Sequence, residues 1–181
     1  KGASEALWFT VSNHLAGGST SNVLLVRDGR LLSPFAHGEE PEGAIASPVR
    51  AGVTRAAIFE LAREQGMEIE VRPLDIEDVL AAGDDWFEKT GREVTYEYVL
   101  LGGENDSEGH ALRLVERLSG RRCSVNLIPY NPTPELPFYR PEGGSPEYFR
   151  DVLVDGGLTA TIRWSRGLEG AAACGQLRLV R

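Results

Sequence analysis

One cysteine near the C-terminal end of the sequence has the surroundings of an accessible thiol. Cys174 stands within residues 171–177, AAACGQL. Alanine and glycine leave the backbone free to move and do not cover the sulfur. A lone cysteine is more often a thiol without a function, so this run by itself leaves both interpretations open.

A second candidate lies at the predicted start of a helix, where Gly52 is followed by Val53 and Thr54. The helix is indicated by the helical spacing of Ile58, Leu61 and Ala62. Backbone N–H groups at such a helix start form a natural phosphate site. Thr54 is equally well explained as a residue that only caps the helix.

The elements expected in residues 1–82 mix strands, a hairpin and helices. Strands are expected over residues 5–11, 22–26 and 67–71, with a positive-φ turn at Asp28-Gly29. The helix that Thr54 caps should end at Gly66, and a short acidic helix should run from Asp75 to about Ala82. This mixture predicts an α+β fold for the first part.

From residue 83 onward helices and strands alternate. After a helical stub at 84–89 and a break at 90–91, strands are expected over 93–101, 123–128 and 158–164. Helices are expected between them over 107–118 and 146–154. Alternation of this kind predicts parallel βα units, so the whole chain is assigned to a mixed α/β class.

Composition excludes several classes of protein. The net charge of the 181 residues is −8; residues 1–82 carry 7 basic and 12 acidic side chains, and the rest carry 12 and 15. Neither part has the basic excess of a nucleic-acid-binding domain, which leaves only a local group of arginines to face phosphate. No stretch is apolar enough to span a membrane. Two cysteines form no disulfide framework, which favours a reducing cytoplasm.

From Thr90 to Leu177 the sequence resembles the radical S-adenosylmethionine methyltransferases that methylate C2 of an adenine in large-subunit ribosomal RNA and, in some cases, in tRNA. The matching stretches, in order, are 95–101, Asn105-Asp106 with His110, 125–132, Arg163 with Arg166-Gly167, and 172–177. The resemblance implies the last βα units of a partial radical-SAM barrel, with rRNA and tRNA as partners.

The same resemblance implies roles for two residues and shows what is missing. Cys174 matches the cysteine that carries the methyl group, and Asn131 matches an asparagine that contacts S-adenosylmethionine. The family binds an iron–sulfur cluster through three cysteines upstream of this region, and it needs a further cysteine to resolve the RNA adduct. Only Cys123 and Cys174 are present here, and Cys123 is expected to be buried.

Residues 2–82 resemble the later portion of class IV aminotransferases, the fold-type IV pyridoxal phosphate (PLP) enzymes, such as branched-chain aminotransferase and aminodeoxychorismate lyase. The matching stretches are 5–7, 18–23, 33–34, 48–55 and 71–74. The resemblance implies that Val53 and Thr54 hold the cofactor phosphate and that the substrate is an amino acid. The family's Schiff-base lysine falls upstream of Gly2, and Gly17 replaces the glutamate that pairs with the pyridine nitrogen.

The two resemblances are expected to join at Leu80-Ala81-Ala82, giving an aminotransferase-like fragment over 1–82 and a methyltransferase C-terminal fragment over 83–181. Whether this chain is an enzyme stays open. Three functions are considered: a fragment or chimera of the RNA methyltransferase, inactive alone; a fragment of the aminotransferase; and a non-catalytic scaffold or binding module. Truncated sheets are expected to expose an edge and an apolar face, and therefore to associate.

Overall fold

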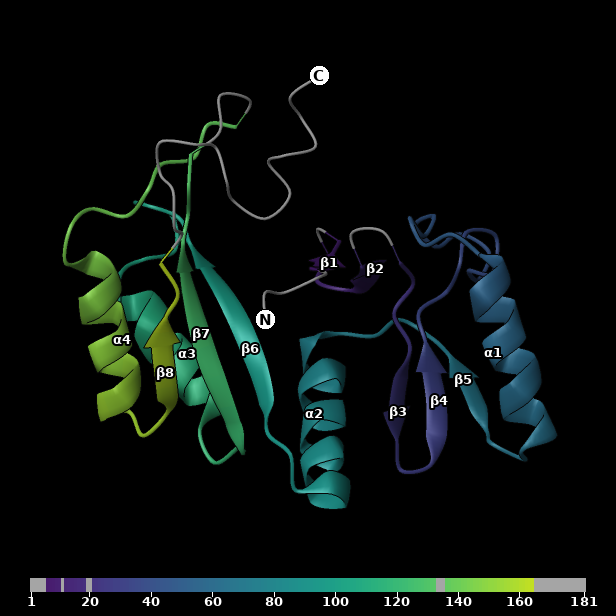
Figure 1. The fold of residues 1–181 in the computed structure, drawn as a ribbon. Coiled ribbons are helices and arrows are strands. Elements are labelled where there is room, and N and C mark those ends of the chain that lie inside the picture. The colour runs from purple at the N-terminus through teal and green to yellow at the C-terminus, as the bar shows by residue number, and fades with distance from the viewer. Residues whose placement is uncertain (1–5, 11, 19–20, 133–135, 165–181) are drawn as a thin grey trace. The chain divides into compact units, whose positions relative to one another are not determined.

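The computed structural model describes residues 6–10, 12–18, 21–132 and 136–164. Cys174 lies outside the described residues. The chain divides into two compact units, the first ending at Gly91 and the second beginning at Arg92 (Figure 1). None of the helices in the described ranges is long and apolar enough to cross a membrane.

The first unit contains two small sheets and two helices. Strand β1 (Leu7–Phe9) pairs antiparallel with β2 (Leu15–Gly18), and β3 (Leu25–Arg27) pairs antiparallel with β4 (Arg30–Ser33). Strand β5 (Ile69–Val71) lies parallel to β4, so this sheet has the order β3-β4-β5. The predicted turn between β3 and β4 is confirmed, because both of its residues have positive φ, 50° and 75°.

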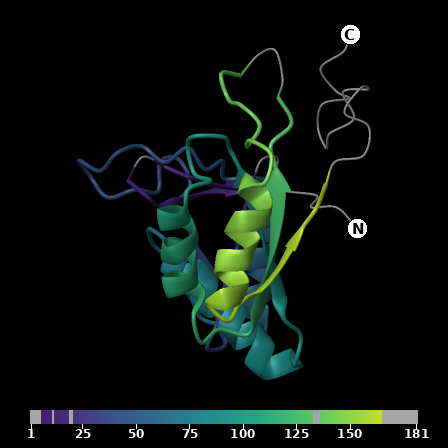
Figure 2. The same cartoon turned by 90° about the vertical axis from the view of Figure 1, so that its left-hand side faces the viewer.

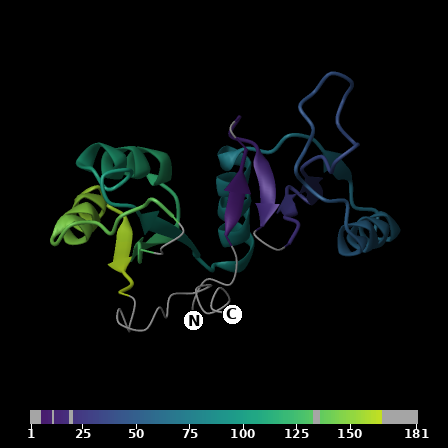
Figure 3. The same cartoon turned by 90° about the horizontal axis from the view of Figure 1, so that it is seen from above.

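Helices α1 (Val53–Glu64) and α2 (Ile76–Thr90) cover opposite faces of the β3-β4-β5 sheet (Figure 3). Successive side chains of a strand point to opposite faces. Leu31 packs with Phe59 and Ala62 of α1, whereas Leu32 packs with Leu74 and Leu15. The α1 residues that are buried are Arg55, Phe59 and Ala62. Leu61, which its spacing grouped with Ile58 and Ala62 on one helix face, is not part of this buried stripe and is exposed.

The expected helix end near Ala82 and the separate helical stub at 84–89 are both wrong, because α2 runs through both. It is continuous, because Asp75 and Asp78 form a reciprocal capping box at its start and Gly91, in the left-handed conformation, ends it. The helix tolerates Gly83 in its interior at a cost of about 1 kcal/mol. The compact units therefore divide nine residues beyond the proposed junction at 82/83, and that junction stays a prediction.

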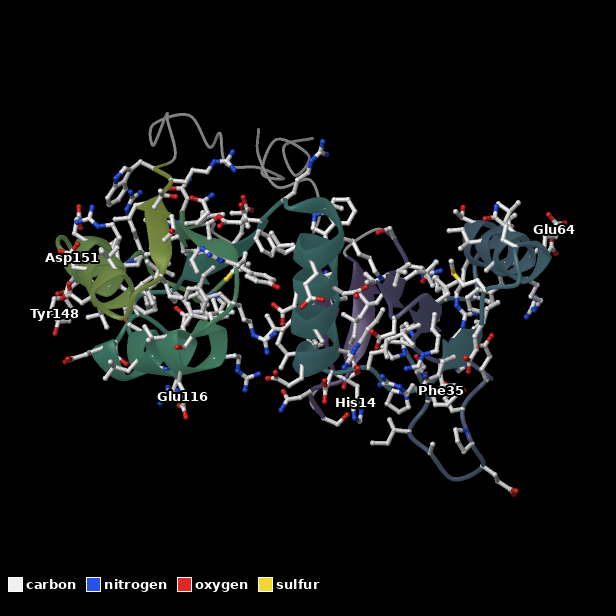
Figure 4. The ribbon with its side chains drawn as sticks, turned by 90° about the horizontal axis from the view of Figure 1, so that it is seen from below. His14, Phe35, Glu64, Glu116, Tyr148 and Asp151 are labelled. Carbon is white, nitrogen blue, oxygen red and sulfur yellow. The ribbon has the colours of Figure 1, made fainter. Side chains whose placement is uncertain are left out.

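The second unit confirms the predicted parallel βα pattern. Strands β6 (Val94–Leu100), β7 (Cys123–Pro129) and β8 (Thr159–Ile162) form a parallel sheet in that order. Helix α3 (Glu108–Leu118) connects the first two strands and α4 (Ser145–Asp155) the last two, and both lie on the same side of the sheet (Figure 2). Their outer surfaces carry Glu116, Tyr148 and Asp151 (Figure 4).

The two faces of the second sheet differ in chemistry. The face under α3 and α4 is apolar; its buried residues include Cys123, Val125 and Leu127, and α4 contributes the buried Phe149 and Leu153. The other face is mainly polar, with only Val99 and Ile128 as apolar members. The expectation of an exposed apolar face is therefore wrong for this sheet. Within the described ranges β6 has no partner on its outer edge, and association through edges stays a prediction.

Candidate functional site

The first candidate site is the start of α1. The residue that precedes the helix is Gly52, with φ 66° and ψ 139°, a conformation that side-chain-bearing residues rarely adopt. Thr54 is therefore the second residue of the helix and not its cap, and no described side chain caps this end. Val53 and Thr54 are both exposed, and helix geometry leaves their N–H groups without an acceptor inside the helix.

A segment distant in sequence meets this helix start. The amide nitrogen of Asn22 donates to the carbonyl oxygen of Arg50 at 2.9 Å. The same nitrogen lies 3.0 Å from the position that a Cβ on Gly52 would occupy, so a larger residue at 52 would press against it. The structure thus brings Asn22, from the 18–23 stretch of the resemblance, beside the Gly52-Val53-Thr54 turn.

Arg55 fixes the loop beside this turn, a role that no motif in the sequence indicated. Its buried guanidinium donates to both carboxylate oxygens of Glu39, at 2.9 and 2.7 Å, and to Ser33 Oγ at 3.0 Å. The guanidinium carbon also lies 4.5 Å from the centre of the Phe59 ring. The bonds from Arg55 hold the pKa of the Glu39 carboxyl below its usual value. An arginine on the buried helix stripe was the signal that could have revealed this clamp.

The first site fits one end of PLP and not the other. Exposed N–H groups and the Thr54 hydroxyl suit a phosphate. The chemistry of PLP in this family also needs a lysine amine. Lys89 is the only described lysine, and it lies in the last turn of α2, where it pairs with Asp85 at 2.5 Å. The described residues therefore do not fit a covalently bound cofactor.

The second candidate site is the polar face of the β6-β7-β8 sheet. Glu97, Asn126 and Thr161 occupy the same register on the three strands. The Asn126 amide donates to Glu97 Oε1 at 3.3 Å and accepts from Thr161 Oγ1 at 3.3 Å. Arg163, just beyond β8, places its guanidinium 3.5 Å from Glu97 Oε1. In β6, β7 and β8 every second residue is mostly polar, and this alternation was the sequence signal for the row.

Asn131 lies two residues beyond the C-terminal end of β7 and is half-buried. Ligands of parallel α/β sheets bind at this end of the strands. Cys123 lies at the opposite end of β7 and, as predicted, is buried. Within the described ranges no group of three or more His, Cys, Asp or Glu side chains could hold a metal ion. The two cysteines of the chain do not fit a cluster that takes three thiolates.

Two other residues of the methyltransferase resemblance build the loop between β6 and α3. Asn105 accepts from the Leu101 N–H at 2.7 Å and donates to the Val99 carbonyl at 2.9 Å. Asp106 accepts from Gly103 N–H and from Ser145 Oγ at the start of α4. They therefore fix the shape of this edge of the sheet and are not free to bind a ligand through the same atoms.

Comparison with known proteins finds relatives for both parts. The "Probable dual-specificity RNA methyltransferase RlmN" of Rhodopirellula baltica is 47% identical over 107 residues, which are 59% of this chain and 29% of that protein. The "Dual-specificity RNA methyltransferase RlmN" of Anaeromyxobacter dehalogenans is 43% identical over 129 residues, 71% of this chain and 34% of that protein. The chain thus spans about a third of the length of these relatives.

A solved structure and a family model complete the comparison. The crystal structure of a radical SAM methyltransferase from Sphaerobacter thermophilus matches with TM-score 0.54 and 39% identity, covering 70% of this chain and 42% of that one. The model of the family described as "Amino-transferase class IV" matches residues 1–95. This match and the 129-residue match to RlmN must share residues, so similarity alone fixes no single junction. This family model covers more than half of the residues of the chain, so the chain belongs to the class IV aminotransferase family.

Proposed function

We propose that the chain carries the C-terminal portion of a radical-SAM 23S rRNA (adenine-C2)-methyltransferase behind its aminotransferase segment. In this proposal Asn131 contacts S-adenosylmethionine and Cys174 is the methyl-carrying residue. The observations that carry the proposal are the polar face of the β6-β7-β8 sheet and the position of Asn131 just beyond the C-terminal end of β7, the end at which parallel sheets bind ligands.

This face has groups suited to a zwitterionic ligand such as S-adenosylmethionine. Glu97 supplies a carboxylate and Arg163, 3.5 Å from it, a guanidinium; Asn126, itself bonded to Thr161, donates to Glu97. Asn131 offers a donor and an acceptor to the edge of a purine. The iron–sulfur cluster does not fit the cysteines of this chain, so the proposal includes binding and no turnover by the chain alone.

Calorimetric titration of the purified chain with S-adenosylmethionine tests the binding site. Asn131→Ala should weaken binding about 3- to 10-fold, as expected for the loss of one hydrogen bond. Asn13→Gly is the matched control, because it removes an asparagine of the first unit and suits the φ of 60° at that position. Equal affinity of both variants and the native chain would contradict the role of Asn131.

Methyl transfer to adenine-containing RNA tests the second part of the proposal. The unaided chain should transfer no methyl group from S-adenosylmethionine, because no three thiolates are available for a cluster. Methylated RNA formed by the chain alone would therefore refute the assignment as an inactive fragment.

A second candidate function rests on the start of α1. There Val53 and Thr54 would hold the phosphate of PLP, with an amino acid as substrate in the parent family, and the approach of Asn22 to Gly52 supports this site. PLP should bind reversibly and resist trapping by borohydride, since Lys89 is paired with Asp85. A pyridoxyl group attached to a lysine after reduction would show that a covalent site exists. A chain that binds neither cofactor would fit the scaffold alternative.

A further inference from the structure

Aromatic and arginine side chains from three segments gather at the C-terminal edge of the second sheet. Tyr139 is 73% exposed, and Trp164, which follows β8, is 47% exposed. The guanidinium carbon of Arg140 lies 5.7 Å from the centre of the Trp164 ring. Tyr130 and Phe138 meet edge to face with ring centres 6.1 Å apart. These five residues are called the aromatic edge.

Backbone contacts fix the aromatic edge to the ends of the strands. The N–H of Gly102 donates to the carbonyl of Tyr139 at 2.9 Å, and a Cβ on Gly102 would lie only 2.6 Å from the carbonyl oxygen of Arg140. The N–H of Tyr130 donates to the carbonyl of Leu100 at 2.9 Å. Gly102 therefore permits a close approach that places Tyr139 and Arg140 beside the sheet.

We propose that the aromatic edge is a binding surface for single-stranded RNA, with bases stacking on Tyr139 and Trp164. This inference deepens the proposed function, because it assigns residues that hold the substrate class. Proteins bind unpaired bases on exposed aromatic rings and guanidinium planes, which the Arg140–Trp164 pair supplies. Arg140 adds a positive charge at this edge.

The charge of the chain decides which interaction must dominate. A net charge of −8 opposes general attraction of nucleic acid, so stacking has to supply most of the affinity. Duplex RNA presents no base faces to such rings, which selects the single-stranded form. Composition did not predict this surface; it indicated only that a local group of arginines could contact RNA phosphate.

Fluorescence of Trp164 provides a direct test. With Trp8→Phe and Trp86→Phe in the full chain, Trp164 is the only tryptophan left. Titration with a ten-nucleotide oligoadenylate should quench its emission to saturation, whereas heparin, which has charge and no bases, should not. In the native background, anisotropy of labelled oligoadenylate should show that Trp164→Ala weakens binding about 5- to 150-fold.

Matched variants separate stacking from loss of structure. Tyr139→Phe keeps the ring and should retain affinity, whereas Tyr139→Leu should lose it. Gly102→Ala changes none of the ring-bearing residues and should weaken binding by displacing the Tyr139–Arg140 segment. Trp86→Ala, at an exposed tryptophan of α2, is the control and should bind like the native chain. Urea midpoints of each variant show whether the second unit stays folded.

Three results would overturn the proposal. The first is native RNA affinity in both Trp164→Ala and Tyr139→Leu, and the second is quenching of Trp164 by heparin equal to that by RNA. The third is a change in the sedimentation of these variants, compared with the native chain, without a change in their RNA binding, which would indicate that the aromatic edge contacts a protein partner. Intact S-adenosylmethionine binding with no RNA binding refutes the aromatic edge alone. The reverse result refutes the cofactor site alone.

Discussion

In the clamp between Arg55 and Glu39, we expect substitution of Glu39 to cost more stability than substitution of Arg55. The Arg55 side chain is 4% exposed, whereas that of Glu39 is 41% exposed. Glu39→Ala leaves a buried guanidinium without its carboxylate. Arg55→Met removes the charge but keeps an aliphatic stem against Phe59, and the Glu39 carboxylate can then be solvated.

The magnitudes follow from this difference in burial. Breaking a fully buried pair from one side costs about 3–5 kcal/mol, and the exposure of Glu39 reduces this to about 2 kcal/mol. Arg55→Met should cost about 1 kcal/mol, because Ser33 Oγ still donates to the Pro34 carbonyl at 3.0 Å. In the Arg55→Met background Glu39→Ala should cost about 1 kcal/mol, because only the bond from the Ala36 N–H is lost and no charge is left unpaired.

Urea unfolding measured by tryptophan fluorescence checks these values. In a Trp164→Phe background the remaining tryptophans, Trp8 and Trp86, both belong to the first unit and report its unfolding. Glu42→Ala, at an exposed residue of the same loop, is the control and should change stability by at most about 0.5 kcal/mol. An equal cost of Glu39→Ala in both Arg55 backgrounds would refute the argument.

Two further predictions concern pH and packing. Hydrogen bonds from Arg72 hold the pKa of Asp78 below its usual value. The ionised Asp78 therefore adds to the free energy of unfolding above its unfolded pKa of about 3.9, and this stabilisation is lost as pH falls through the folded pKa. The urea midpoint of the first unit should therefore fall in acid, and Asp78→Asn should flatten that fall. A Cβ on Gly156 would lie 2.5 Å from Val115 Cγ1, so Gly156→Ala should destabilise the second unit by about 1–3 kcal/mol in urea unfolding, whereas Gly143→Ala, with open space around it, should not.

Local sequence patterns predicted most elements of this chain correctly. The Asp28-Gly29 turn, the end of α1 at Gly66 and the strand–helix alternation of the second unit were all readable, because each depends on neighbouring residues. The boundary near Ala82 was wrong for the same reason. Leu80-Ala81-Ala82 followed by Gly83 looked like a helix end, but the capping box at Asp75 and the C-cap at Gly91 make one continuous helix.

The sequence by itself determined which residues could do chemistry: Cys174 in its small-residue run, Asn131, and the Val53-Thr54 turn. It also determined which were missing, since thiol and lysine counts need no coordinates. Only the tertiary structure decided which distant residues meet. The Glu97–Asn126–Thr161 row depends on strand register, the Arg55–Glu39 clamp on how a loop folds over α1, and the Arg140–Trp164 pair on a backbone bridge at Gly102. Such contacts form between segments far apart in the chain, so a local pattern can mark the residues that take part but not which of them meet.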